Sequence, residues 1–314
     1  NMARKKKGLK INGWVNLHKP AGVTSTQMVS KVRWALNVQK AGHGGTLDPL
    51  ASGVLPIALG EATKTVNFAQ DAMKTYIFEV TWGEQRSTDD AEGDTINTSD
   101  KRPSQDNIEA ILDNYVGDIE QTPPQFSAIK INGERAYDIA RDGDVADIKS
   151  RPVYIEALGI TEHTGDTTTF ECYCGKGTYI RSLARDMGLQ LGCFGYISML
   201  KRTKVGVFEL NNAISLDIIE NLRDNPTQED VVLPLQTVLD DIPVLALQDQ
   251  EATRLKNGQS LTFITRPDIE RLNAANINWK DDKGDIALAS LNDTPIAMVE
   301  VMGGNIRSLR VFNV

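Results

Sequence analysis

The sequence has few cysteines and no long apolar run. Its 314 residues include only Cys172, Cys174 and Cys193, and no C-x-x-C pair occurs. No His or Cys partner has the spacing of metal ligands, so the sequence predicts that Cys172 and Cys174 are buried strand cysteines and not a metal site. No run approaches the roughly 18 apolar residues of a membrane helix, and the N-terminus lacks the apolar core of a secretory signal. We therefore expect a cytoplasmic protein without membrane contact.

Cofactor motifs are absent as well. Neither the dinucleotide-binding pattern G-x-G-x-x-G nor the phosphate-binding pattern G-x-x-x-x-G-K-[ST] occurs, and we expect no cofactor. The composition, 40% hydrophobic and 24% charged, is ordinary for a globular protein. A length of 314 residues predicts one large domain and a smaller one.

Acidic residues are missing from the first 47 positions. The whole chain carries a net charge of −8, so with nine basic groups in this segment the remainder carries −17. The basic groups are Arg4, Lys5, Lys6, Lys7, Lys10, Lys19, Lys31, Arg33 and Lys40. A chain polarised in this way can offer a basic face to a phosphate backbone while staying acidic elsewhere. For residues 4–10 alone, a merely solvated tail is an equally good interpretation.

Hydrophobic periodicity predicts several elements. Apolar spacing indicates helices at 25–37, 108–115 and 178–191, and the alternation at 76–82 indicates a strand. The polar and acidic stretch 84–107 is typical of a long surface loop.

The pattern changes near residue 240. A short helix at 248–256 precedes three strand-like runs at 285–291, 295–301 and 308–314. We therefore divide the chain into a domain at 1–240 and a smaller one at 241–314.

The segment from His43 to Pro56 carries the strongest chemical signal. Asp48 precedes a proline, which biases its backbone towards an extended or turn shape. The glycines before it allow another backbone to approach closely, and the apolar residues after it anchor the loop. The pattern predicts one acidic group held rigidly in a glycine-lined pocket. An isolated Asp-Pro is more often a simple turn, so the assignment depends on the rest of the chain.

Further segments complete a known signature. They are Lys19-Pro20 with Gly22 and Ser25, Gly60 to Lys64, Lys74-Thr75-Tyr76, Pro123 to Lys130, Gly177 to Leu183, and Leu200 to Thr203. In this order, and with the Asp48 segment, they resemble the TruB family of pseudouridine synthases, which act on uridine 55 of tRNA. The chain departs from the family pattern at Arg86-Ser87 and at Lys201. Both departures concern RNA contacts, and we expect neither to touch the chemistry.

The resemblance implies the fold and the partner. It implies an α+β protein whose central sheet is mixed and largely antiparallel, with flanking helices: the pseudouridine synthase fold. Residues 1–240 would form the catalytic domain, with an RNA-gripping insertion at 123–150. Residues 241–314 would form a small β-rich RNA-binding domain of the PUA type. The expected partner is the T-arm and T-loop of tRNA, and a monomer is the default.

The resemblance also implies the roles of single residues. Asp48 would be the catalytic carboxylate, Arg181 its partner, and Tyr76 an aromatic platform that also handles the C5 proton of uracil. The expected substrate-binding residues are Lys19, His43, Lys64, Tyr179 and Leu200, and no metal is expected. Of these, Lys19 and Lys64 would contact phosphate or the neighbouring loop. The reaction breaks the bond from N1 to C1′ and rejoins the flipped base through C5. Asp48 can attack C1′, attack C6 or remove the C2′ proton, and the sequence leaves these routes open.

Two other functions compete with this one. A tRNA-binding or tRNA-folding protein without catalysis can share the scaffold, but binding alone needs no carboxylate that faces an anionic ligand. A glycosidase normally uses two carboxylates, and no second one lies in a comparable loop. A protein-interaction module has no support in the sequence.

Overall fold

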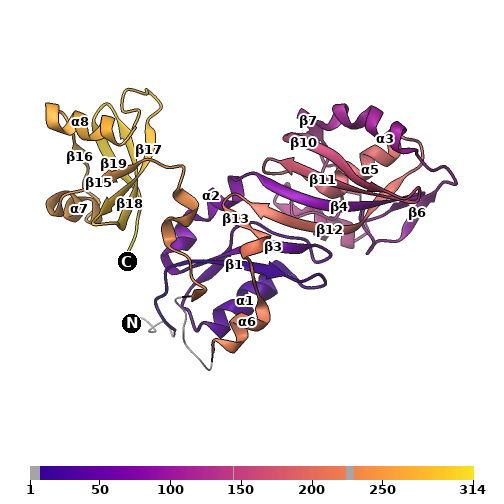
Figure 1. Cartoon of the computed structure of the whole chain (residues 1–314), viewed down its shortest axis with the longest axis horizontal. Coiled ribbons are helices and arrows are strands. Elements are labelled where there is room, and N and C mark those ends of the chain that lie inside the picture. The colour runs from indigo at the N-terminus through magenta and orange to yellow at the C-terminus, as the bar shows by residue number, and fades with distance from the viewer. Residues whose placement is uncertain (1–7, 144, 224–229) are drawn as a thin grey trace.

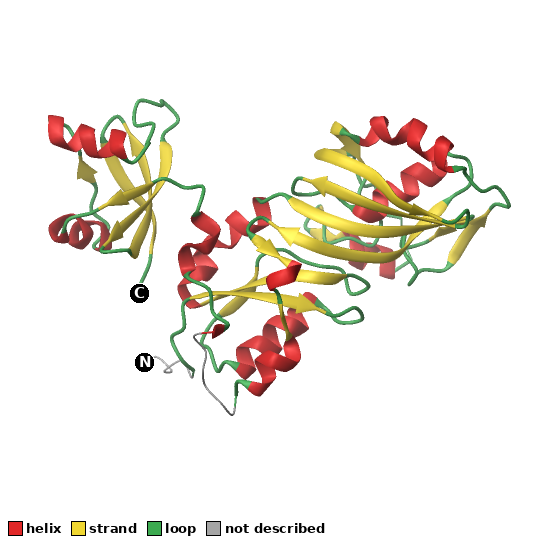
Figure 2. Ribbon diagram, in the orientation of Figure 1, coloured by secondary structure: helices red, strands yellow, loops and turns green. Residues whose placement is uncertain are grey.

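The computed structural model describes residues 8–143, 145–223 and 230–314, and two sheets dominate it (Figures 1 and 2). The basic residues at positions 4–7 lie outside the described residues. No helix within the described ranges is long and apolar enough to cross a membrane.

The larger sheet has the strand order β14-β1-β3-β12-β4-β11-β10-β7, with β2 beside β3 and β13 beside β12. Its strands are β1 (Gly13–Lys19), β2 (Ala41–His43), β3 (Ser52–Leu59), β4 (Lys74–Trp82), β7 (Gly117–Gln121), β10 (Arg151–His163), β11 (Thr167–Cys174), β12 (Gly195–Val205), β13 (Phe208–Glu209) and β14 (Ile214–Ser215). The pairs β1–β14 and β3–β12 are parallel and the others antiparallel. This arrangement confirms the predicted mixed, largely antiparallel sheet.

Helices flank this sheet, as Figure 2 shows. They are α1 (Ser25–Ala35), α2 (Val66–Asp71), α3 (Gln105–Leu112), α4 (Ala136–Arg141), α5 (Ile180–Gln190) and α6 (Leu216–Asn221). Thr24 is the N-cap of α1 and forms a capping box with Gln27. The apolar face predicted for α5 is confirmed, since Leu183 and Met187 are fully buried. Helices α3 and α5 pack against β10 and β12, and α1 packs beside α6.

The prediction of a long surface loop at 84–107 is wrong. Strands β5 (Glu84–Arg86) and β6 (Thr95–Thr98) form a hairpin, and α3 already begins at Gln105. The turn of this hairpin packs inward, so Asp89 and Asp90 are only 6% and 4% exposed. Buried carboxylates are tolerated when cations reach them. Those cations come from α5, so no local pattern in the sequence reveals them.

The C-terminal part forms a five-stranded sheet of order β15-β17-β18-β19-β16 and confirms the small β-rich unit. Its elements are β15 (Val244–Ala246), α7 (Asp249–Lys256), β16 (Leu261–Thr262), α8 (Arg266–Ala274), β17 (Asp285–Leu291), β18 (Thr294–Met302) and β19 (Asn305–Val311). The sequence did not predict α8, whose capping box joins Thr265 to Asp268.

The two units touch each other through one apolar cluster and a few polar contacts. Trp14 and Met298, one from each sheet, belong to the same buried cluster. Lys64 Nζ donates to the Val311 carbonyl at 2.7 Å. The domain division at residue 240 stays a prediction, although the second sheet begins only four residues later, at β15.

Candidate active site

Asp48 lies in a short loop that we call the Asp48 loop (residues 44–51), between β2 and β3. The loop starts where the Gly44 amide donates to the Pro56 carbonyl at 2.7 Å. It ends in a turn in which the Ala51 amide donates to the Asp48 carbonyl at 3.0 Å. Both ends are thus fixed by main-chain hydrogen bonds, and the Asp48 side chain stays 35% exposed.

The segment between β1 and α1 fastens the same loop. Ser25 Oγ donates to the Leu47 carbonyl and accepts from the Leu47 amide, both at 2.9 Å. The Gly22 amide and Lys19 Nζ donate to the Pro49 carbonyl at 2.7 and 3.3 Å. The residues on both sides of Asp48 are therefore held, which preorganises the carboxylate.

Arg202 on β12 is a third support, and sequence reasoning missed it. Its side chain is only 2% exposed. It donates to the carbonyls of Gly45, Thr46 and Val54 at 3.1, 3.2 and 2.9 Å. One guanidinium thus ties the loop to the strand that follows it. The available signal was its position in the Leu200 to Thr203 segment that carries the family likeness.

Gly53 lets β3 approach Arg202. Its φ is +113°, and a Cβ at this position would meet the Arg202 carbonyl oxygen at 2.1 Å. We expect Gly53→Ala to lower the free energy of unfolding by about 3 kcal/mol or more, since it adds a backbone clash to the conformational strain. Gly192→Ala is the matched control: its φ is +70° and nothing lies within 4 Å, so only about 1 kcal/mol should be lost. Urea unfolding compares the two, and equal losses would contradict the clash.

Arg181 on α5 forms an ion pair with Asp48. Its Nε lies 3.0 Å from Asp48 Oδ2, but without the alignment of a hydrogen bond. Its Nη1 donates to the carbonyls of Phe126 and Thr88 at 3.1 and 3.2 Å and lies 3.9 Å from Asp90 Oδ2. The guanidinium is 7% exposed and so is fixed on several sides.

The hairpin turn between β5 and β6 therefore touches the site. The Thr88 carbonyl binds Arg181 directly. Next to it, Asp89 Oδ2 lies 3.2 Å from Arg185 Nη1. Burial raises the pKa of Asp89 to about 6, against the opposing effect of Arg185.

Two tyrosines stand near Asp48. Tyr76 on β4 is half-buried and lies opposite Arg202 in the strand register. Burial raises its pKa, and the nearby Arg202 opposes this shift. Tyr179 precedes α5, where Gln121 exchanges hydrogen bonds of 2.8 and 3.1 Å with its main chain. Burial and then the charge of Asp48 raise the pKa of Tyr179, so both phenols are neutral near pH 7.

Lys19 is fully buried, and its Nζ donates to the carbonyls of Pro20 and Val23 as well as Pro49. Of its two expected contacts, phosphate or the neighbouring loop, the structure places it on the loop. Burial lowers its pKa from 10.5 to about 8. A depressed lysine pKa means that the unfolded chain binds the proton more tightly, so stability rises between pH 8 and 10.5.

This linkage gives a pH prediction. The free energy of unfolding of the parent, measured relative to Lys19→Met, should rise by about 3 kcal/mol between pH 8 and pH 10.5. Taking the difference cancels the other titrating groups and the constant cost of the lost hydrogen bonds. Urea unfolding at both pH values tests it, and a difference that does not change with pH would contradict a depressed pKa.

The other predicted binding residues take different positions. His43 on β2 is half-buried, its Nδ1 finds no partner among the described residues, and burial lowers its pKa, so it is neutral. Lys64 points to the C-terminal unit, where it binds Val311 and Glu61. Leu200 is 5% exposed and lies opposite Phe78 in the core. The structure thus joins Asp48, Arg181 and the Lys19 loop by direct contacts, and every predicted contact with substrate stays a prediction.

Within the described ranges, no group of three His, Cys, Asp or Glu residues can hold a metal ion. The three cysteines are free and buried, which the sequence predicted for Cys172 and Cys174.

Comparison with known proteins decides the family. The chain is 46% identical to tRNA pseudouridine synthase B of Caulobacter sp. (strain K31), over 99% of both chains. It is 47% identical to the protein of the same name from Dinoroseobacter shibae, over 99% of this chain and 98% of the relative. The chain belongs to the TruB family of pseudouridylate synthases. It is therefore an enzyme of the isomerase class, as the sequence predicted.

Two family models and one solved structure agree with this membership. The N-terminal domain model of the TruB family pseudouridylate synthases matches residues 33–180. The model of the tRNA pseudouridylate synthase B C-terminal domain matches residues 181–240. The fold is similar to a chain in the crystal structure of a Cbf5-Nop10-Gar1 complex, with a TM-score of 0.68 and 25% identity over 96% of this chain and 84% of that one.

Proposed function

We propose that this TruB-family enzyme converts uridine 55 in the T-loop of tRNA to pseudouridine, with Asp48 as the catalytic carboxylate. The single observation that carries the proposal is the ion pair of 3.0 Å between Arg181 and Asp48. Hydrogen bonds to Leu47 and Gly45 hold the loop that carries Asp48 in place. The names of the relatives, tRNA pseudouridine synthase B, support tRNA as the substrate.

The chemistry follows from the charges. When the bond from N1 to C1′ breaks, positive character develops on the sugar and negative charge on the base. An ionised Asp48 beside C1′, C2′ or C6 serves each of the three routes. Arg181 holds the carboxylate in one orientation. Because the loop is already held in place, the active site does not have to rearrange when the reaction occurs.

The target uridine must leave its stack to reach Asp48, which costs a few kcal/mol. Stacking on the Tyr76 ring returns about 1–3 kcal/mol. Because burial keeps the Tyr76 phenol neutral, it can move the C5 proton only by passing one proton on as it takes another. Tyr179 lies near Asp48, whose charge helps to raise the pKa of the phenol. Its hydroxyl would bind the edge of the uracil.

The insertion at 123–150 would bind the T-arm, and it also contacts the active site through Arg181. The Phe126 carbonyl binds Arg181, and the Phe126 ring meets Tyr137 edge to face at 6.0 Å. Arg141 lies over the Tyr137 ring. RNA bound by this exposed arginine is thus connected to Arg181 through two rings and one carbonyl. Residues 241–314 would bind RNA as a separate PUA-like domain.

The substrate assignment can be tested with a tRNA transcript that carries tritium at C5 of every uridine. Isomerisation releases one tritium for each uridine converted. We expect one equivalent per tRNA, and none from a transcript in which cytidine replaces uridine 55. Undiminished release from the second transcript would show that another position is the target.

A further inference from the structure

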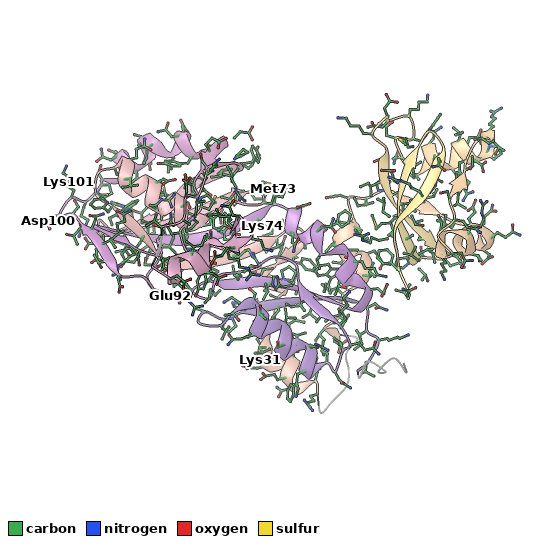
Figure 3. All side chains as sticks on the ribbon, turned by 180° about the vertical axis from the view of Figure 1, so that it is seen from behind. Lys31, Met73, Lys74, Glu92, Asp100 and Lys101 are labelled. Atoms are coloured by element: carbon green, nitrogen blue, oxygen red, sulfur yellow. The ribbon has the colours of Figure 1, made fainter. Side chains whose placement is uncertain are left out.

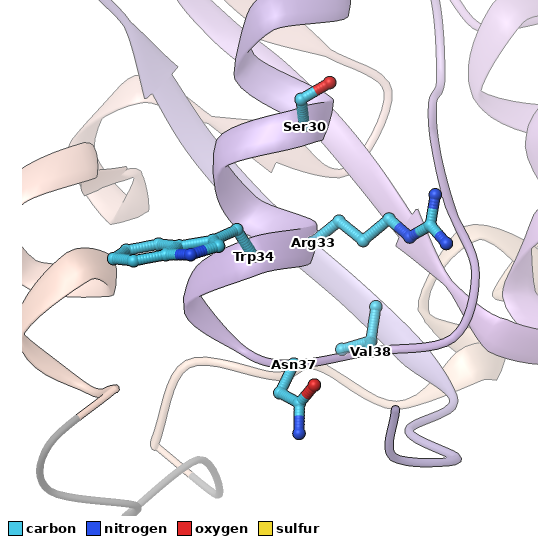
Figure 4. Close-up of a pocket in the computed structure, with 5 residues that line it drawn as sticks. All are labelled: Ser30, Arg33, Trp34, Asn37 and Val38. Atoms are coloured by element: carbon cyan, nitrogen blue, oxygen red, sulfur yellow. The ribbon is translucent and has the colours of Figure 1, made fainter. Parts of the chain in front are cut away.

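The outer face of α1 carries a cavity that the reaction does not use. Ser30, Arg33, Trp34, Asn37 and Val38 line it, with a volume of about 320 Å³. In the close-up of Figure 4, Trp34 and Arg33 diverge from the helix on opposite sides of this space. Trp34 is 56% exposed, and the Arg33 side chain has no hydrogen bond or ion pair to any described residue. An exposed indole next to an arginine that has no partner in the described part of the chain suits a ligand better than a core.

Arg223 covers one face of the Trp34 ring. Arg223, which follows α6, places its Cζ 3.8 Å from the centroid of the Trp34 ring. A second contact joins the same helices, since Lys31 Nζ lies 3.7 Å from Glu220 Oε1. The ring is therefore held in one orientation, and more than half of the side chain stays open to solvent. Preorganised aromatic faces of this kind stack unpaired bases.

Positive charge gathers at this end of α1. Lys31, Arg33 and Lys40 are exposed there. The main chain of Leu9 pairs with residues 37–39, which brings the exposed Lys10 to the same end. All of these belong to the 47 residues without an acidic group, whereas the rest of the chain carries −17. The exposed basic groups alone would suit either a phosphate backbone or an acidic protein surface. The exposed Trp34 ring, on which a base can stack, favours the nucleic acid.

We propose that the surface formed by Ser30, Arg33, Trp34, Asn37 and Arg223, called here the Trp34 surface, binds the RNA substrate outside the catalytic site. An unpaired base stacks on the free face of Trp34, and Arg33 and Arg223 contact phosphates. The inference rests on the proposed function, since it takes the RNA to be the substrate. Nine residues separate Trp34 from Ser25, which is about 14 Å along the helix and about half a turn around it. Ser25 binds Leu47 next to Asp48, so an RNA that binds at both places must extend around α1 to its outer face.

A purely structural role for Trp34 makes a different prediction. If the stack with Arg223 served only to join α1 to α6, Trp34→Ala would lower stability and leave the KM for RNA unchanged. If the surface binds RNA, the KM rises while kcat stays at the parental value, because the chemistry at Asp48 is untouched. The split between KM and kcat therefore separates the two roles.

The test uses the full-length chain and an unmodified full-length tRNA transcript labelled with tritium at C5. For Trp34→Ala we expect a KM raised about fivefold or more, with kcat within twofold of the parent. Trp34→Phe keeps an aromatic face and should stay close to the parent. Arg33→Gln should reduce the slope of log KM against log salt by about one phosphate contact. Lys101 lies at the left edge of the molecule in Figure 3, well away from Lys31. Lys101→Gln is the matched control for the loss of one exposed charge and should change neither KM nor its salt dependence.

Parental KM values for both Trp34→Ala and Arg33→Gln would overturn the proposal and leave the surface to a partner other than RNA. Equal effects of Arg33→Gln and Lys101→Gln would overturn it too, since they would reflect net charge alone. Failure of the proposed function looks different: the parent itself would release no tritium.

Discussion

Replacing Asp48 by Asn should abolish isomerisation without weakening RNA binding. The amide keeps the size of the side chain but carries no charge, so it can neither attack the sugar or base nor take the C2′ proton. Losing the group that acts on the reacting atoms typically costs about 10⁴-fold or more in kcat. Tritium release at saturating tRNA measures this loss, and filter binding measures the affinity for tRNA.

The control for this variant is Asp100→Asn. Asp100 is exposed on the loop that follows β6, so its replacement removes the same charge away from the site and should leave kcat unchanged. Removing the Asp48 charge should slightly strengthen RNA binding, because a carboxylate repels phosphate. An Asp48→Asn variant that retains more than a tenth of the parental kcat would show that another group carries out the reaction.

Replacing Arg181 by Lys should give the second largest loss. A lysine keeps the positive charge, but its ammonium is a point charge and cannot contact Asp48, the Thr88 carbonyl and the Phe126 carbonyl in the geometry of the guanidinium. Asp48 would then lose its fixed orientation. We expect kcat to fall by about 10²- to 10³-fold, the usual cost of one lost electrostatic group in an active site.

Arg185→Lys is the matched control, one helical turn further along α5. Arg185 pairs with Asp89 and Asp186 and binds the Thr122 carbonyl, with no contact to Asp48. We expect less than a tenfold loss of kcat there, with kcat measured by tritium release. Equal losses in the two variants would mean that the arginines act only by holding the hairpin turn, and the special role of Arg181 would be wrong.

The sequence predicted the parts of the fold that local patterns determine. The α5 face and strand β4 follow from apolar spacing within a few residues. The rigid Asp48 loop was predictable from its glycines and from the proline after the aspartate. The isomerase class and the fold came from the resemblance, which depends on seven ordered segments and not on any one of them.

The parts that the sequence did not reveal depend on contacts between distant residues. Arg202 supports carbonyls about 150 positions earlier in the chain, and no periodicity indicates such a bond. Asp89 and Asp90 have the composition of a surface loop, but arginines of α5 allow them to be buried. Lys64 follows the Asp48 segment closely, although its nitrogen binds β19 in the other sheet. In each case the sequence alone predicts an exposed charged residue, because the partner that buries it lies far away in the chain.

The central claim is that the fastened Asp48 loop isomerises uridine 55. The most direct measurement is a single-turnover reaction with tRNA that carries tritium at C5 of that one uridine, with enzyme in excess. We expect the parent to release one equivalent of tritium and Asp48→Asn to bind the same tRNA without releasing any. Tight binding by the parent without release of tritium would contradict the claim and leave an RNA-binding protein in its place.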